Sequence, residues 1–259
     1  MARKLVADGI VKSISPDTVR RILLHHKLKP WRKHVWLGAK KPRDESFLPI
    51  IRNICDLYTR PLAPNEAVIS VDEKTSLQPR PRVTPTQPAQ SSQPVRVEHE
   101  YKRLGALNLI AGFDTRTGKV FGRCYARKRA IEFIDFLEGL GRDVDPKIEI
   151  IHITLDNPRM HKSKAVLAWL AAHPRFRFHY TPVHCSWMNQ VEQWFGTLQR
   201  KRLGISDFAS LEDLEAKILK YIEHYNQYSQ PYNWTTKSVT KVMAWAEREV
   251  RQAPCKQVA

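Results

Sequence analysis

Three acidic residues stand beside or within apolar segments of the chain. Asp72 follows AVISV, Asp156 follows IEIIHITL, and Glu192 lies inside SWMNQVEQWF. The first two segments are typical of buried strands, and the third is typical of a helix. Carboxylates that meet from two strand ends and a facing helix form an oxygen-rich site for Mg²⁺, the hard cation that phosphate chemistry most often uses. The three residues therefore predict metal-dependent chemistry on a phosphate.

The charge of the chain indicates which kind of phosphate. The 259 residues contain 43 Lys and Arg against 26 Asp and Glu, a net charge of +17. Twelve of the basic residues lie within residues 1–45, which hold only four acidic ones. Such an excess is the electrostatic footprint of a protein that binds nucleic acid. A basic soluble protein without a fixed partner is the alternative that charge alone leaves open.

Hydrophobic periodicity predicts the elements that position the acidic residues. Short runs rich in β-branched and aromatic residues predict strands at 67–71, 106–113, 119–125, 148–155 and 176–180. Helical patterns are found at 131–137, 163–172 and 188–202. The tight turn at 114–118 makes the second and third strands antiparallel, and helical crossovers make the remainder parallel. The expected class is α/β, with a mixed five-stranded sheet flanked by helices.

The predicted sheet brings two of the acids to one edge. Asp72 ends the first, central strand, with residues 73–75 leading out of the sheet, and Asp156 stands at the exit of the fourth strand. Ligands of open α/β sheets gather outside the carboxyl ends of the strands. Glu192 is expected at the border of a buried helical stripe, turned toward the sheet. That stripe consists of Trp187, Val191, Phe195 and Leu198.

The segment before the sheet has the pattern of a DNA-binding helix. Ser15 is the expected N-cap and Pro16 the first helical residue of a helix that runs to about His26. Its predicted core face consists of Val19, Ile22 and Leu23. A recognition helix is divided in this way between core and groove, although a solvated basic helix fits the same pattern. The candidate DNA contacts are Arg20, Arg21, His25, Lys27, Lys29, Arg32 and Lys33.

Two segments flank the first strand. An amphipathic pattern over residues 46–60 predicts a connecting helix, which Pro61 and Pro64 end. Residues 78–100 contain five prolines, which is typical of an extended or mobile loop. A surface insertion without a binding role is one interpretation of this loop. The other is DNA contact through Arg80, Arg82 and Arg96.

Several functional classes lack the residues that they need. The four cysteines form no C-x-x-C pair, so neither a zinc ribbon nor a disulfide framework is predicted. His179, His184 and Cys185 lie close in sequence but have no second ligand pair at zinc-finger spacing. The sequence contains no Gly-rich phosphate loop, which argues against a nucleotide cofactor. No apolar run approaches the ~20 residues that cross a bilayer, so we expect a cytoplasmic protein with no membrane partner.

Three sequence blocks resemble those of a known family. VDEKT, LDN followed by His161-Lys162, and SWMNQVEQWF are similar to the motif blocks of bacterial insertion-sequence transposases in the mariner-like superfamily, of the insertion sequence 630 type. The resemblance continues through GRCYARKRAIEFIDFL and AWLAAHPRFRFHYTP to EHYN and NWT, from Ser15 to about Lys241. The 36 positions between Asp156 and Glu192 are similar to the spacing of the family's last two acids.

The resemblance implies a fold, a site and a reaction. It implies an RNase H-like DDE catalytic domain in which the two aspartates and the glutamate hold two Mg²⁺ or Mn²⁺ ions. Motif neighbours that support the ligands or position DNA correspond to Asn157, His161 and Asn189. The implied reaction is cleavage at transposon ends and transfer of the freed 3′-hydroxyl into target DNA, typically at a TA dinucleotide. The implied partners are double-stranded DNA, as transposon ends and target, and a second copy in a homodimer associated with the bacterial nucleoid.

The chain departs from the family in two places. Family members usually carry two helix-turn-helix units before the catalytic domain, and this chain begins inside what resembles the second. Pro158-Arg159-Met160 stands where the family tends to have a small or aromatic residue and a Gly, which affects where the next helix starts.

The expected organisation has four segments. We expect a partial helix-turn-helix segment with a basic arm at 1–45, a connecting helix at 46–65, the RNase H-like catalytic domain at 66–245 and a tail at 246–259. Two other functions remain open. One is a DNA-binding derivative that regulates full-length copies, and the other is a structure-selective nuclease of the same fold.

Overall fold

The structure is a computed structural model that describes residues 1–26, 43–157, 159–204 and 208–251. The chain divides into two compact units, residues 1–40 and residues 41–259. No helix among the described residues combines the length and the apolar character that crossing a lipid bilayer requires. The expected segment boundaries at residues 45, 65 and 245 stay predictions.

The second unit contains the predicted five-stranded sheet. The strands are β1 (Glu66–Leu77), β2 (Leu107–Asp114), β3 (Val120–Tyr125), β4 (Ile150–Leu155) and β5 (Phe176–Tyr180). Their order is β3-β2-β1-β4-β5, so β1 is central, as predicted. β4 pairs parallel with both β1 and β5, whereas β2 is antiparallel to both β1 and β3. The sheet is therefore mixed, and the turn between β2 and β3 makes the predicted antiparallel pair.

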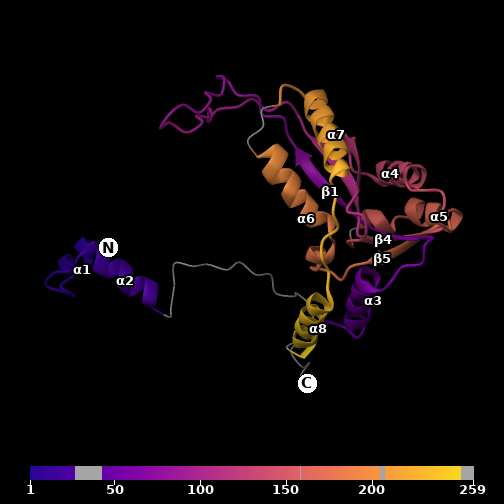
Figure 1. Cartoon of the computed structure of the whole chain (residues 1–259), viewed down its shortest axis with the longest axis horizontal. Helices are drawn as coiled ribbons and strands as arrows, with labels where there is room; N and C mark the ends of the chain where they lie inside the picture. Colours follow the sequence, from indigo (N-terminus) through magenta and orange to yellow (C-terminus); the bar gives the residue numbers. More distant parts are fainter. Residues whose placement is uncertain (27–42, 158, 205–207, 252–259) are drawn as a thin grey trace. The chain divides into compact units, whose positions relative to one another are not determined.

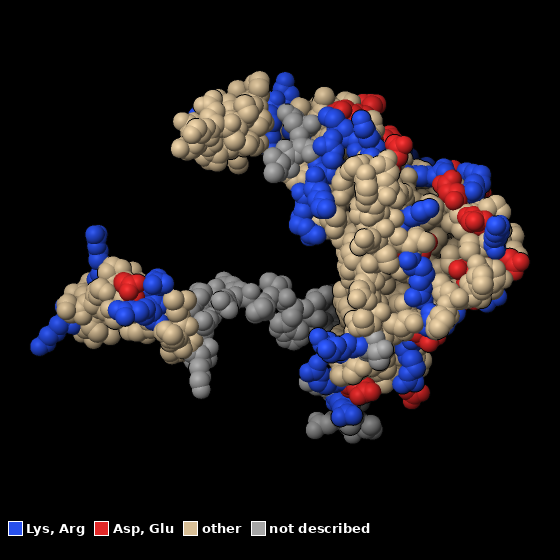
Figure 2. All heavy atoms as spheres, in the orientation of Figure 1, with Lys and Arg blue, Asp and Glu red and all other residues tan. Residues whose placement is uncertain are grey.

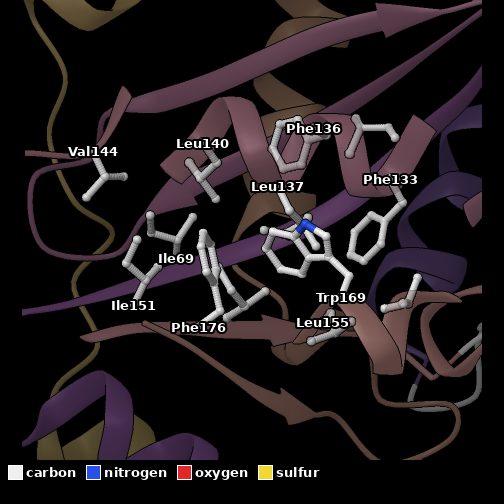
Figure 3. Close-up of a cluster of buried hydrophobic side chains, with 14 residues drawn as sticks. Ile69, Phe133, Phe136, Leu137, Leu140, Val144, Ile151, Leu155, Trp169 and Phe176 are labelled. Carbon is white, nitrogen blue, oxygen red and sulfur yellow. The ribbon is translucent and has the colours of Figure 1, made fainter. Parts of the chain in front are cut away.

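One face of the sheet is covered by α4 (Ala130–Asp143) and α5 (Lys164–Ala172). Alternate residues of β1 and β4, including Ile69 and Ile151, pack there against aromatic and leucine side chains of α4 and against Trp169 of α5 (Figure 3). Fully burying one such apolar side chain contributes about 1.5–3 kcal/mol to folding. This apolar layer holds the strands that carry Asp72 and Asp156.

Four helices lie over the other face of the sheet or beside its lower edge: α3 (Phe47–Thr59), α6 (Val191–Leu198), α7 (Leu211–Gln227) and α8 (Thr236–Arg251) (Figure 1). α6 contacts β1 and β2, α7 contacts β3, and α3 packs against α8. Helix α3 confirms the predicted connecting helix and ends before Pro61. Its buried residues join Val68 of β1 and Met188 in one apolar cluster.

Strand β1 is longer than the sequence predicts. Residues 73–75 were expected to lead out of the sheet, but Glu73 and Lys74 pair with Ile110 and Leu109 of β2. The register shifts between Lys74 and Leu77, with a positive φ of 58° at Ser76. The expectation was wrong because β2 extends the antiparallel ladder beyond the point where the parallel neighbour β4 stops.

The proline-rich loop forms an extended arm. Its two sides are joined by isolated antiparallel bridges at Arg82 and Tyr101, at Gln87 and Arg96, and at Gln90 and Gln93. The arm projects from the end of β1 and returns to the start of β2 (Figure 1). Residues 86–95 at its outer end carry no charged side chain.

The first unit contains α1 (Ala2–Ala7) and the predicted helix α2 (Pro16–His25). The Ser15 side chain accepts a hydrogen bond from the Thr18 backbone N–H, so the predicted N-cap is confirmed. Val19 is buried, whereas Ile22, predicted for the core face, is exposed. That prediction was wrong because α1, a single short helix without buried residues, covers little of α2.

Candidate active site

Asp72 lies where the parallel strand β4 ends. Val71 pairs with Leu155, the last residue of β4, while Asp72 itself pairs with Ala111 of β2. Because side chains alternate along a strand, Asp72 shares a face with Ser70 and Ala111, on the side of α6 and α7. Asp72 is only 6% exposed. An ionisable side chain in such a place requires a compensating charge or loses its own.

Asp156 follows Leu155 directly, so its predicted place at the exit of the fourth strand is confirmed. Thr154, two residues earlier, pairs in register with Ser70, which puts it on the same face of the sheet. The Asp156 side chain is 32% exposed. Its Oδ1 atom is shielded from solvent and lies 3.4 Å from His161 Nδ1, with which it forms an ion pair when His161 is charged.

Glu192 lies in the first turn of α6, which begins at Val191. Its side chain is exposed, and its orientation toward the sheet stays a prediction. The predicted buried stripe holds for Val191, Phe195 and Leu198, but Trp187 is 43% exposed. The prediction failed at Trp187 because residues 186–188 form a separate 3₁₀ turn, which breaks the α-helical periodicity.

The three carboxyl groups influence one another. Burial, the negative charge of Asp156 and then that of Glu192 together raise the pKa of Asp72 to about 8. Acids from β1, β4 and α6 thus act on the same buried position. Among the described residues, no three His, Cys, Asp or Glu side chains already surround a common point for an ion.

His161 joins two acids behind this position. It is fully buried, its Nε2 is 2.7 Å from Glu73 Oε1, and its ring packs on Phe133 with the centroids 4.4 Å apart. Burial alone lowers the pKa of His161, but Asp156 and Glu73 outweigh burial and raise it to about 9. A charged His161 then bridges the two carboxylates. Sequence reasoning missed Glu73, whose only signal is its place beside Asp72 in a strand that continues.

Asn189 connects the strand of Asp72 to the helix of Glu192. Its side-chain Nδ2 donates to the backbone oxygen of Val71, at 2.7 Å, and its own backbone oxygen accepts from the Glu192 N–H at 3.1 Å. Asn189 is completely buried. The predicted supporting residue Asn157 is exposed instead. A role for Asn189 in holding two acidic residues together follows from its two bonds.

Replacing Asn189 with alanine is expected to cost about 1–3 kcal/mol of stability, because the buried Val71 carbonyl loses its donor. Asn226→Ala serves as a matched control, since Asn226 bonds the backbone N–H and oxygen of Val120 on β3, away from the acids. Urea unfolding should show losses in both variants. Only Asn189→Ala should weaken the stabilisation by Mg²⁺, and equal weakening in both would contradict the assignment.

A buried hydroxyl links α3 to all three acid-bearing segments. The Tyr58 hydroxyl donates to the Met188 backbone oxygen at 3.0 Å, and it lies 3.0 Å from the hydroxyls of both Ser70 and Thr154. Ser70 and Thr154 precede Asp72 and Asp156 by two residues each, and they are 2.8 Å apart. Met188 precedes Glu192 by four residues. Nothing in the sequence singles out Tyr58 from the other buried residues of an amphipathic helix.

All the predicted DNA contacts lie in the first unit, residues 1–40. Arg20, Arg21 and His25 are exposed on α2, and both arginines form ion pairs with Asp17. The remaining predicted contacts, Lys27, Lys29, Arg32 and Lys33, lie outside the described residues. His179, part of the sequence cluster weighed as a zinc site, instead bonds His152 and Asn53.

The sequence of this chain matches a known protein family. Residues 67–215, more than half of the chain, match the family described as DDE superfamily endonuclease. The chain belongs to the DDE superfamily endonucleases. This DDE endonuclease chain is 28% identical over 134 residues to a Shigella sonnei protein named insertion element IS630 uncharacterized 39 kDa protein. The alignment covers 52% of this chain but only 38% of that protein.

Solved structures share the fold of this DDE endonuclease chain. The Mos1 strand transfer complex aligns with a TM-score of 0.55 and 14% identity, covering 97% of this chain and 73% of that one. The Mos1 mariner paired end complex with Mn aligns with 0.52 and 15% identity over 97% and 74%. The catalytic domain of Mos1 mariner transposase aligns with 0.51 and 14% identity over 83% and 97%. These likenesses confirm the predicted RNase H-like fold.

Proposed function

We propose that this chain is a DNA transposase, which cleaves the ends of its element and joins the freed 3′-hydroxyl to target DNA. The proposal rests on the electrostatic influence that Asp156 and Glu192 exert on Asp72, in a chain of the DDE superfamily endonucleases. The insertion-element relative supports element ends as the substrate. The paired end and strand transfer complexes of its structural relatives support the two successive steps.

The donor set fits divalent cations. All three side chains offer carboxylate oxygen, which is the ligand that Mg²⁺ and Mn²⁺ prefer. Burial and then the negative charges of Asp156 and Glu192 raise the pKa of Asp72, and a bound cation would favour its ionised form. We propose two such ions, and Mn and Mg are both named in complexes of the Mos1 relatives.

The positions of the three acidic residues suggest a separate role for each. Bound divalent cations would supply a polarised water or 3′-hydroxyl as nucleophile and would offset charge on the leaving oxygen. Asp72, held inside β1, gives the site a fixed ligand. Asp156 is oriented from behind by His161. Glu192, exposed on the first turn of α6, approaches from the solvent side, where a DNA strand has access to the site.

The proposed partners follow from the reaction. Transposon ends and target are double-stranded DNA, and holding two ends together requires two catalytic units, so we propose a homodimer. The helix α2 and the predicted basic residues around it would contact the DNA ends. Association with the bacterial nucleoid in the cytoplasm follows from the same substrate.

The test is Mg²⁺-dependent cleavage and strand transfer on DNA that carries the ends of the element. The chain is compared with Asp156→Ala at equal DNA affinity. We expect cleavage and transfer by the unmodified chain, and a loss of both by at least about 10³-fold in the variant, since removing a metal ligand removes several kcal/mol of transition-state stabilisation.

Other outcomes distinguish the alternatives. Cleavage without strand transfer would indicate a structure-selective nuclease of the same fold. DNA binding without cleavage in either protein would indicate a DNA-binding derivative that regulates full-length copies. Either result would overturn the proposal.

A further inference from the structure

A pocket of about 170 Å³ opens at the base of the extended arm, where β1 ends. Polar side chains from the end of β1 and the start of the arm line one side, and residues from the segment after α6 line the other. The lining includes Ser76, Gln78, Arg80, Arg82, Gln199 and Phe208. None of its described lining residues is acidic. The pocket is smaller than the roughly 300–1,000 Å³ that encloses a whole small ligand, so it suits part of a longer one.

The arginines of this pocket gather around one tyrosine. The guanidinium carbons of Arg80 and Arg82 lie 5.1 and 5.7 Å from the centre of the Tyr101 ring. Arg103 and these two arginines lower the pKa of Tyr101, which shows that three positive charges meet there. No described acidic side chain forms an ion pair with Arg80 or Arg82. Their charge is therefore available to an anion.

The segment after α6 carries further positive charge beside the pocket. It continues as a π-helix, Gln199–Leu203, whose two end residues line the pocket and whose three inner residues are Arg200, Lys201 and Arg202. Such wide turns occur frequently at functional sites. Lys and Arg side chains gather where the arm meets the body in the space-filling view (Figure 2). The outer end of the arm, residues 86–95, has no charged residue, so the charge is concentrated at the base.

Two elements run side by side from the carboxylates to this pocket. Ser76 follows Asp72 by four residues along β1, or about 13 Å at ~3.3 Å per residue. Gln199 follows Glu192 by seven residues along the helix, or about 10 Å at ~1.5 Å per residue. Lys74 lies between, with its ammonium 5.9 Å from the ring centre of Phe195 on α6. A DNA strand carries phosphates at short regular intervals, so a strand bound at the acids has a phosphate within reach of the pocket.

We propose that this arm-base pocket binds backbone phosphate of a DNA strand a few positions from the phosphate held at the three carboxylates. This inference rests on the proposed function and names a site for its substrate. The arginines and the Gln78 and Gln199 amides donate to the phosphate oxygens, and Phe208 forms an apolar floor for the adjoining sugar. The contact does not read sequence. It fixes the register of the strand in the active site.

The experiment is the salt dependence of DNA binding in the presence of a chelator, so that catalysis plays no part. A fluorescent 30-base-pair duplex of fixed sequence is titrated with the full chain and with Arg80→Gln/Arg82→Gln. We expect the variant to bind at least about tenfold more weakly at low salt, and the slope of log affinity against log salt to fall by about two, one for each lost phosphate contact.

The matched control is Arg96→Gln, because Arg96 belongs to the arm but does not line the pocket. Its slope should equal that of the unmodified chain, and thermal melts of all three proteins check that the fold is intact. An unchanged slope in the double variant, or an equal loss in Arg96→Gln, would overturn the pocket while leaving the proposed function standing. If metal-dependent cleavage is absent but the slope still falls by two, the proposed function fails and the DNA site is upheld.

Discussion

Replacing Asp72 with asparagine is expected to abolish Mg²⁺-dependent cleavage and, at the same time, to make the metal-free protein more stable. The substitution replaces the metal-binding carboxylate inside β1 with a neutral amide. This change should lower the cleavage rate by at least about 10³-fold. The substitution also removes a buried carboxyl group. Burial and the charges of Asp156 and Glu192 oppose the ionisation of that group. Activity and stability should therefore change in opposite directions.

The pH dependence of stability shows the second effect directly. The pKa of Asp72 is about 8 in the folded chain, against an ordinary value near ~3.9 in the unfolded chain. The unfolded chain therefore releases this proton at lower pH, and the stability of the folded state falls as pH rises from about 4 to 8. In Asp72→Asn this fall is absent. A smaller fall remains between about pH 6.5 and 9, where His161, with a folded pKa of about 9, loses its charge and its ion pairs.

Thermal melts at pH 5 and pH 8, with and without Mg²⁺, measure these effects. At pH 8 without metal, Asp72→Asn should melt higher by about 2–4 °C for each kcal/mol of repulsion removed. Mg²⁺ should raise the melting temperature of the unmodified chain but not that of Asp72→Asn. Asp143→Asn is the control, because that side chain is 51% exposed and pairs with Arg123 away from the acids. A variant that melts lower than the unmodified chain at pH 8 would contradict the repulsion argument.

The sequence predicts those parts of the site that depend on local pattern. Asp156 lies where it is expected because an apolar run of this length can only be a buried strand, and the acid comes directly after it. Asp72 was placed at a strand end, and it lies inside one, because the length of β1 depends on its pairing with β2, a partner distant in sequence. The acids were therefore identifiable, but the geometry around Asp72 was not.

Features that depend on contacts between distant segments had no signal in the sequence. Glu73 was expected outside the sheet, yet its carboxylate pairs with the buried His161, 88 positions later. Trp187 was assigned to the buried stripe of the next helix, but it packs edge-on against Trp245 of α8 with the ring centres 5.2 Å apart. Each of these positions is decided by packing across elements, which periodicity within one element does not describe.

The hydroxyl of Tyr58 contacts residues from three different segments near the site. Its single proton goes to the Met188 carbonyl, so the Ser70 and Thr154 hydroxyls have two protons between them for the remaining contacts. Hydrogen bonds between buried groups are strong. When one is lost, the remaining polar group is left without a partner, because water does not reach it. Through them α3, the first helix of the second unit, is joined to the segments that carry Asp72, Asp156 and Glu192.

Tyr58→Phe is therefore expected to act on metal binding more than on folding. The ring keeps its edge contact with Trp234, at 5.0 Å between centres, and Ser70 and Thr154 can still bond each other. The Met188 carbonyl loses its side-chain donor, at a cost of about 1–3 kcal/mol in stability. Since the three acid-bearing segments lose their common tie, the Mg²⁺ concentration for half-maximal cleavage should rise about 10–100-fold, as for other groups that orient metal ligands.

A titration of cleavage rate against Mg²⁺ concentration, run beside urea unfolding, separates this role from simple destabilisation. Tyr125→Phe is the matched control, because the Tyr125 hydroxyl donates to Asp135 near the surface and contacts none of Asp72, Asp156 and Glu192. It should leave the Mg²⁺ requirement unchanged. Thr154→Val should raise that requirement as well, and adding it to Tyr58→Phe should have less than the combined effect, since both changes remove the same tie. Additive effects, or a normal Mg²⁺ requirement in Tyr58→Phe, would show that the hydroxyl serves only the fold.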